Sequence, residues 1–216
     1  RDVLGSRGLG DVYKRQLMYI KDGDKFTEIV PFNVGFRRIE IKPIEQKAAN
    51  GKPYVCLFIN GQPLKLKGVN IHEHNPATGH YVTEELMRRD FELMKQHNLN
   101  SVRLCHYPQD RRFYELCDEL GLYVIDRANI NAPDRRDDRR VGGTPSNDPA
   151  LADEYLERVK AMYYRSRNHT CVVAFALGGE SGNGYNMYKA YEWLKSVEKS
   201  RPVIYTDADG EWNSDL

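Results

Sequence analysis

The sequence has 216 residues, of which 40% are hydrophobic and 11% aromatic, enough to bury a sizeable core and too much for a disordered chain. Its formal net charge of +1 gives no reason to expect a nucleic acid or an anionic membrane as partner. It also lacks an apolar run of the roughly 18 residues that a membrane span needs. The four cysteines have neither CxxC nor His/Cys metal-binding spacing, so we expect free buried thiols at Cys56, Cys105, Cys117 and Cys171.

The first part of the chain divides into two segments. Residues 1–16 have no clean hydrophobic period and resemble a translated sequencing adapter, so we expect a non-native leader. Residues 17–36 read as short strands around a tight turn at Lys21–Asp24, which predicts the end of a β-sandwich. Farther on, Asn60-Gly61 lies between two apolar runs and fits a type I′ hairpin turn.

From residue 64 onward, apolar strands alternate with amphipathic helices. Thr83 and Asp148 are expected helix N-caps, and Gly121 is expected to end a helix. Short connections between strand and helix predict an α/β fold with a parallel sheet, either open and doubly wound or the first part of an eight-stranded barrel. The expected strands are 64–72, 100–107, 122–130, 172–179 and 202–208, and the expected helices are 83–97, 110–120, 149–166 and 185–197.

Polar residues follow each of the five expected strands. A doubly wound nucleotide-binding sheet should carry GxGxxG after its first strand, and residues 68–76 do not. Functional groups at the C-terminal ends of successive strands are typical of a barrel, so we predict a partial (β/α)8 barrel of about five strands with a ligand site at that edge. The strand-end residues are His72, Glu73, His74, Arg103, His106, Asp126, Asn129, Glu180, Asp207 and Asp209.

Glu180 follows an apolar run, residues 172–177, that is typical of a strand buried on both faces. Glycines on both sides would let a ligand approach the backbone closely. A carboxylate in this place suits an acid/base catalyst at the mouth of a barrel. The alternative is a loop glutamate that caps the next helix.

Six blocks of the sequence, in collinear order, resemble glycoside hydrolase family 2, and most closely its β-galactosidase branch. The resemblance implies a retaining, exo-acting glycosidase built from a jelly-roll domain, immunoglobulin-like sandwiches and a catalytic barrel. Residues 17–36 would then end an immunoglobulin-like domain, and residues 37–216 would form the N-terminal part of the barrel. The blocks are GFRRIEI (35–41), NGQPLKLKGVNIHEHNP (60–76), SVRLCHYP (101–108), CDELGLYVIDRANI (117–130), RNHTCVVAFALGGESGNG (167–184) and SRPVIY (200–205).

The resemblance also implies roles for individual residues. Glu180 matches the acid/base catalyst, His72 and His106 match two histidines that contact sugar hydroxyls, and Arg103 matches an arginine near the catalytic carboxylates. Trp212 is a candidate for stacking on the sugar. The nucleophile should follow the seventh barrel strand, beyond Leu216, so we expect the 216-residue piece by itself to be inactive.

The sequence departs from the family pattern at four positions. The asparagine before the acid/base catalyst, which hydrogen-bonds a sugar hydroxyl, is Gly179 here. The positions of the magnesium site hold Arg127, Asn131 and Pro133, which cannot supply the charged oxygens that a hard cation prefers. We therefore expect no metal and no cofactor, with Arg127 supplying positive charge in the metal's place.

The polar segment 131–149 holds six charged residues in succession, 135–140. It is either a solvated surface loop whose charges pair with one another or a recognition element for an acidic or sulfated sugar. The expected partner is a carbohydrate, and a homo-oligomer is possible. The compartment stays open between the bacterial periplasm and the cytoplasm. The alternative to an enzyme is a non-catalytic carbohydrate-binding relative, because a site that lacks these groups can still bind sugar.

Overall fold

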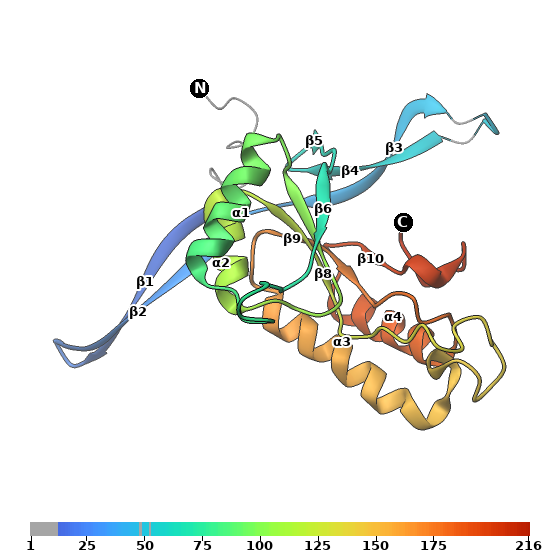
Figure 1. The fold of residues 1–216 in the computed structure, drawn as a ribbon. Coiled ribbons are helices and arrows are strands. Elements are labelled where there is room, and N and C mark those ends of the chain that lie inside the picture. Colours follow the sequence, from blue (N-terminus) through green and yellow to red (C-terminus); the bar gives the residue numbers. More distant parts are fainter. Residues whose placement is uncertain (1–12, 48, 52) are drawn as a thin grey trace.

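The computed structural model describes residues 13–47, 49–51 and 53–216. These residues form an antiparallel hairpin, a small three-stranded sheet, and a five-stranded parallel sheet with four α-helices (Figure 1). No helix in the described part of the chain is long and apolar enough to cross a membrane. Most of the expected leader, residues 1–12, lies outside the described residues.

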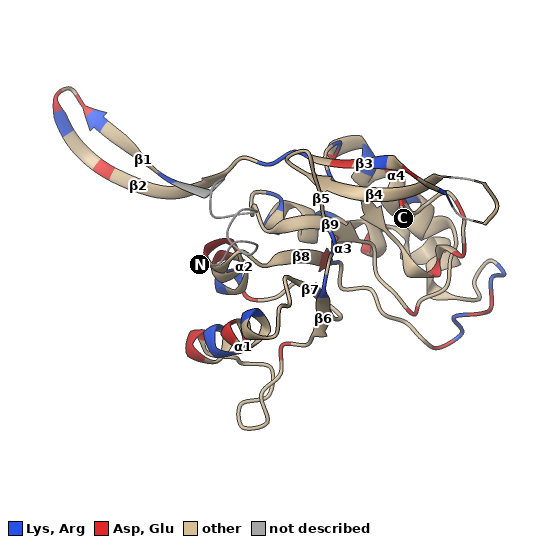
Figure 2. Ribbon diagram, turned by 90° about the horizontal axis from the view of Figure 1, so that it is seen from above, with Lys and Arg blue, Asp and Glu red and all other residues tan. Residues whose placement is uncertain are grey.

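Strands β1 (Tyr13–Asp22) and β2 (Lys25–Gly35) form a hairpin that extends away from the rest of the molecule (Figures 1 and 2). The tight turn predicted here is confirmed, because Asp22 pairs with Lys25. Residues 13–16, which were expected to belong to the leader, pair within this hairpin. Between 42% and 53% of the surface of its large apolar side chains is exposed: Leu17, Met18, Tyr19, Ile20, Phe26, Ile29 and Phe32.

Strands β3 (Ile39–Lys47), β4 (Pro53–Ile59) and β5 (Gln62–Pro63) form the antiparallel sheet. Asn60 and Gly61 have φ values of 49° and 80°, so the predicted type I′ turn is confirmed. β5 has only two residues.

The parallel sheet contains β6 (Gly68–Ile71), β7 (Ser101–Leu104), β8 (Tyr123–Arg127), β9 (Val172–Ala176) and β10 (Val203–Ile204). Its spatial order, β10-β9-β8-β7-β6, follows the sequence without reversal. A doubly wound sheet reverses its strand order at a switch point, whereas a barrel wall adds each strand beside the previous one. The sheet is therefore five strands of a barrel wall.

The helices are α1 (Glu84–Gln96), α2 (Arg111–Leu120), α3 (Ala152–Ser166) and α4 (Tyr185–Val197). Thr83 caps α1 as expected, and Gly121 ends α2 with a φ of 72°. Asp148 caps a 3₁₀ turn, Pro149–Leu151, and α3 begins only after it.

The core lies between the helices and the parallel sheet. Every side chain of β9 is buried, as expected for a strand covered on both faces. Phe91 of α1 and Phe113 of α2 are fully enclosed, and their ring centroids lie 5.0 Å apart. Met87 of α1 is buried, whereas Leu93 of the same helix is 44% exposed.

Candidate active site

Strand register brings the predicted site residues to one edge of the sheet. Ile71 of β6 pairs with Leu104 of β7, so His72 and Cys105 follow the same register pair. Arg127 of β8 pairs with Ala176 of β9, which the segment carrying Glu180 follows. Because the strands are parallel, all these residues lie at the C-terminal edge of the barrel wall.

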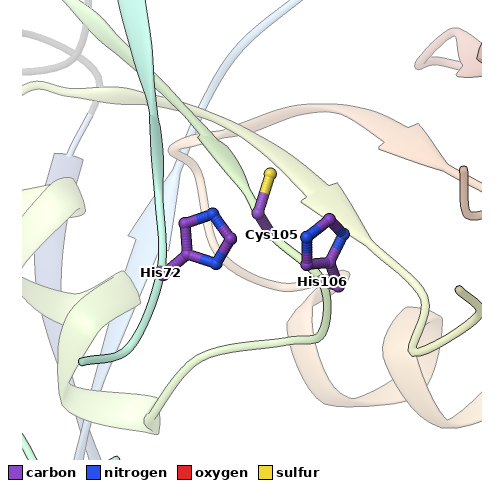
Figure 3. A group of neighbouring side chains, drawn as sticks. All are labelled: His72, Cys105 and His106. Carbon is purple, nitrogen blue, oxygen red and sulfur yellow. The ribbon is translucent and has the colours of Figure 1, made fainter.

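His72 and His106 come together at this edge, with ring centroids 5.1 Å apart in an edge-on arrangement (Figure 3). Burial lowers the pKa of His106, and the positive charge of Arg127 and the neighbouring His72 lower it further. These effects favour the neutral imidazole, whereas the charge of Glu180 opposes them. Its Nδ1 atom is buried and has no hydrogen-bond partner among the described residues.

Two guanidinium groups flank the sulfur of Cys105. The distance to Cys105 Sγ is 4.0 Å from Nη1 of Arg103 and 3.9 Å from Nη1 of Arg127. Arg127 is 1% exposed, and its Nη2 donates a hydrogen bond to Oδ1 of Asn131 at 2.9 Å. Burial lowers the pKa of Arg127, as does Arg103, while Cys105 and Glu180 act in the opposite direction.

The residues at the family's magnesium positions do not fit a hard cation. The oxygen of Asn131 already accepts a hydrogen bond from Arg127, and the guanidinium of Arg127 places a positive charge beside that oxygen. A second set, His72, Cys105 and His106, has ligand atoms within 4.8 Å of one another and donor types that zinc accepts (Figure 3). Arg103 and Arg127 beside the sulfur oppose a divalent cation there.

Glu180 is exposed on a loop between β9 and α4, and its φ is 52°. The loop is anchored by Asp207, a buried residue whose Oδ2 accepts hydrogen bonds from the backbone N–H groups of Ser181 (2.7 Å) and Gly182 (3.0 Å). α4 begins after Gly184 without a side-chain cap among the described residues, so Glu180 does not cap that helix. Its charge instead acts on His106 and Arg127.

Gly179 and Trp212 have different surroundings. Gly179 is buried directly against the guanidinium of Arg127. Trp212 is 55% exposed and stacks on Tyr188 of α4, with ring centroids 5.2 Å apart. Its described ring contacts are with Tyr188 and Tyr191 of that helix.

Charged side chains of the segment 131–149 pair largely with nearby charges. Arg136 forms an ion pair with Asp207 at 3.0 Å. Arg139 lies between Asp209 (2.5 Å) and Glu211 (3.2 Å), and Arg140 pairs with Asp138 at 2.7 Å. Only the pair Arg140–Asp138 lies within the loop, whereas Arg136 and Arg139 pair with carboxylates of residues 207–211, so the loop is tied to the segment after β10 rather than paired only with itself.

Two residues have places in this geometry that differ from those expected from the sequence. Cys105 was expected to be an ordinary buried thiol, but its sulfur lies between two arginines. Asp207 was expected to face the sugar, but it is 5% exposed and holds the Glu180 loop. The position of Cys105 near the end of an expected strand is the one sequence signal that could have placed it at the site.

Comparisons with known proteins give a consistent family. The model described as "Glycosyl hydrolases family 2, TIM barrel domain" matches residues 54–215. A β-galactosidase of Vibrio cholerae is 48% identical over 80% of this chain, and one of Pectobacterium atrosepticum is 42% identical over 95%. The chain spans only 15% and 18% of the lengths of these two relatives.

Among solved structures, a β-glucuronidase from Ruminococcus gnavus in complex with C6-substituted uronic isofagomine has a TM-score of 0.66 and 26% identity. The match covers 88% of this chain and 31% of that structure. A Bifidobacterium dentium β-glucuronidase complexed with coumarin-3-O-glucuronide shares the fold, with a TM-score of 0.69.

Proposed function

Because the chain belongs to glycoside hydrolase family 2, we propose that the protein carrying it is a retaining, exo-acting, β-galactosidase-like glycosidase with Glu180 as its general acid/base. The observation that supports this most directly is the position of Glu180, exposed at the C-terminal edge of the barrel wall and directly after Gly179, which packs against Arg127. Residues 1–16 would then be a leader and residues 17–36 the end of the sandwich domain. Residues 37–216 would form the start of the catalytic barrel.

A retaining glycosidase needs two carboxyl groups about 5 Å apart. In the proposed mechanism, Glu180 protonates the leaving oxygen while a second carboxylate attacks the anomeric carbon. Glu180 then removes a proton from the water that hydrolyses the glycosyl-enzyme intermediate. The exposed position of Glu180, on a loop held by Asp207, leaves it accessible to a substrate.

His72, His106 and Arg103 are proposed to bind the terminal sugar. The neutral ring of His106, with its unpartnered Nδ1, can exchange a hydrogen bond with a hydroxyl group. Arg103 is half-buried and forms none of the described ion pairs, so its N–H groups are available to sugar oxygens. Trp212 is proposed to stack on the sugar only through the half of its surface that Tyr188 leaves exposed.

We propose that the site works without magnesium, with the fixed charge of Arg127 in its place. The hydrogen bond from Arg127 to Asn131 supports this, because it uses the oxygen that a metal would need. The pairing of Arg136, Arg139 and Arg140 favours a neutral terminal sugar over an acidic or sulfated one. A non-catalytic sugar-binding role is the second candidate: Gly179 lacks the side chain that the family pattern has at this position, but the β-galactosidase relatives support an enzyme.

Replacement of Glu180 by Gln in the full-length protein tests the proposal. Hydrolysis of an alkyl β-galactoside, a poor leaving group, should fall by about 10²–10⁴-fold because the proton donor is lost. The kcat/KM for a dinitrophenyl β-galactoside reports only the first step, whose leaving group needs no such proton, and should fall much less. Glu85→Gln, an exposed substitution on α1, serves as the control and should leave both rates unchanged. Sugar binding without turnover by the parent protein would instead support the second candidate.

A further inference from the structure

Gly179 is a glycine that its own backbone conformation does not require. Its neighbours Gly178 and Glu180 have φ values of 153° and 52°, in the region that L side chains rarely adopt. Gly179 is not among the described residues with positive φ. The absence of a side chain at this position is therefore a matter of space rather than of backbone strain.

The guanidinium of Arg127 occupies that space. A Cβ atom at position 179 would lie 2.8 Å from Nη2 and 3.2 Å from Cζ of Arg127, and 3.3 Å from Oγ1 of Thr206. Non-bonded heavy atoms are favourable only from about 3.5 Å outward, so either the arginine or the backbone would have to move.

Arg127 has little freedom to make room. Its side chain is 1% exposed, its Nη2 is bonded to Asn131, and its Nη1 lies against Cys105. The Nε atom is buried without a partner among the described residues. A buried cation that is incompletely paired costs stability, and such groups are concentrated at functional sites.

We propose that Arg127 is a positioning residue of the active site, and that its guanidinium and a side chain at position 179 exclude each other. The inference rests on the proposed glycosidase function and deepens it. Arg127 bridges the ends of three strands, because it contacts Cys105 after β7, Asn131 after β8 and Gly179 after β9. It thereby fixes the backbone on which Glu180 is carried.

A double-mutant cycle on thermal unfolding of the full-length protein tests the coupling. Gly179→Ala should lower the unfolding midpoint by roughly 2–10 °C in the parent, because it overpacks the site. In the Arg127→Ala background, it should lower the midpoint little or not at all. Gly143→Ala is the control. Its Cβ would lie 2.4 Å from the carbonyl oxygen of Asp138, and its three nearest atoms all belong to Asp138 rather than Arg127. The cost of this substitution in unfolding midpoint should therefore be the same in both backgrounds. Equal costs of Gly179→Ala in the two backgrounds would overturn the proposal.

The positioning role is tested by rescue. Arg127→Ala should lower kcat by about 10–100-fold with a smaller change in KM, since misplacement of a catalytic group is costly. Added guanidinium ion at millimolar concentration should restore part of this rate, but none of the rate lost in Glu180→Gln. Arg127→Ser, which also leaves space for the added ion, replaces Arg127→Ala if the latter does not fold. No restoration by guanidinium would contradict the positioning role. The double-mutant cycle measures unfolding and needs no enzymatic activity. It therefore tests the contact between Arg127 and position 179 even if the proposed glycosidase function is wrong.

Discussion

Asp126 is a carboxylic acid without exposed surface at the end of β8. It accepts hydrogen bonds from Oη of Tyr114 (2.9 Å), the backbone N–H of Arg127 (2.9 Å) and the hydroxyl of Ser166. Burial nevertheless raises its pKa from 3.8 to about 6. The folded state therefore binds more protons than the unfolded state between these two values. The contribution of Asp126 to stability is fully present below pH 3.8 and is lost as the pH rises through about 6.

Asp126→Asn should remove this pH dependence. As the pH rises from 4 to 6.5, the free energy of unfolding of the parent should fall relative to the variant by about 2 kcal/mol, with a slope of at most about 1.4 kcal/mol per pH unit. Urea unfolding at a series of pH values measures the difference. Asp137→Asn, on the exposed loop, is the control. If the difference in unfolding free energy between parent and variant were constant over this pH range, burial would not raise the pKa of Asp126.

At the scale of elements, the loop between β9 and α4 depends on one buried side chain. Asp207→Ala would leave the backbone N–H groups of Ser181 and Gly182 without an acceptor, at a cost of about 1–3 kcal/mol for each unsatisfied group. Because these residues follow Glu180 directly, kcat of the full-length enzyme should fall by about 10–100-fold. Steady-state kinetics with aryl β-galactosides and thermal unfolding measure the two effects. Unchanged kcat in a destabilised variant would mean that the loop does not position Glu180.

Elements were more predictable from the sequence than contacts were. Thr83, Asp110 and Gly121 act through bonds to their own neighbouring backbone, so local sequence predicts where α1 and α2 begin or end. The contact between Arg127 and Gly179 joins the last residue of β8 to the loop after β9, and these two strands meet only in the folded sheet. The family resemblance marked both positions as unusual, but no spacing along the chain indicates that one side chain fills the space of the other.

For the whole molecule, the exposed apolar hairpin and two free sheet edges predict self-association of the chain expressed by itself. Among the described strands, β6 pairs only with β7, and β10 only with β9, so each presents unpaired backbone groups. Large apolar side chains of β1 and β2 are also half exposed. Light scattering after size exclusion should therefore show assembly that increases with concentration.

Two variants separate the contributions of the hairpin and the sheet edges. Replacement of Leu17, Tyr19 and Ile29 by Lys, Thr and Lys should reduce assembly by making the hairpin polar, but should not abolish it, because the edges of the parallel sheet remain. The further substitution Val69→Lys, on the edge strand β6, should reduce assembly more, since charged edge residues disfavour strand pairing. A monomer at all concentrations in the unsubstituted chain would contradict the prediction. Complete loss of assembly in the hairpin variant would assign it to the hairpin alone.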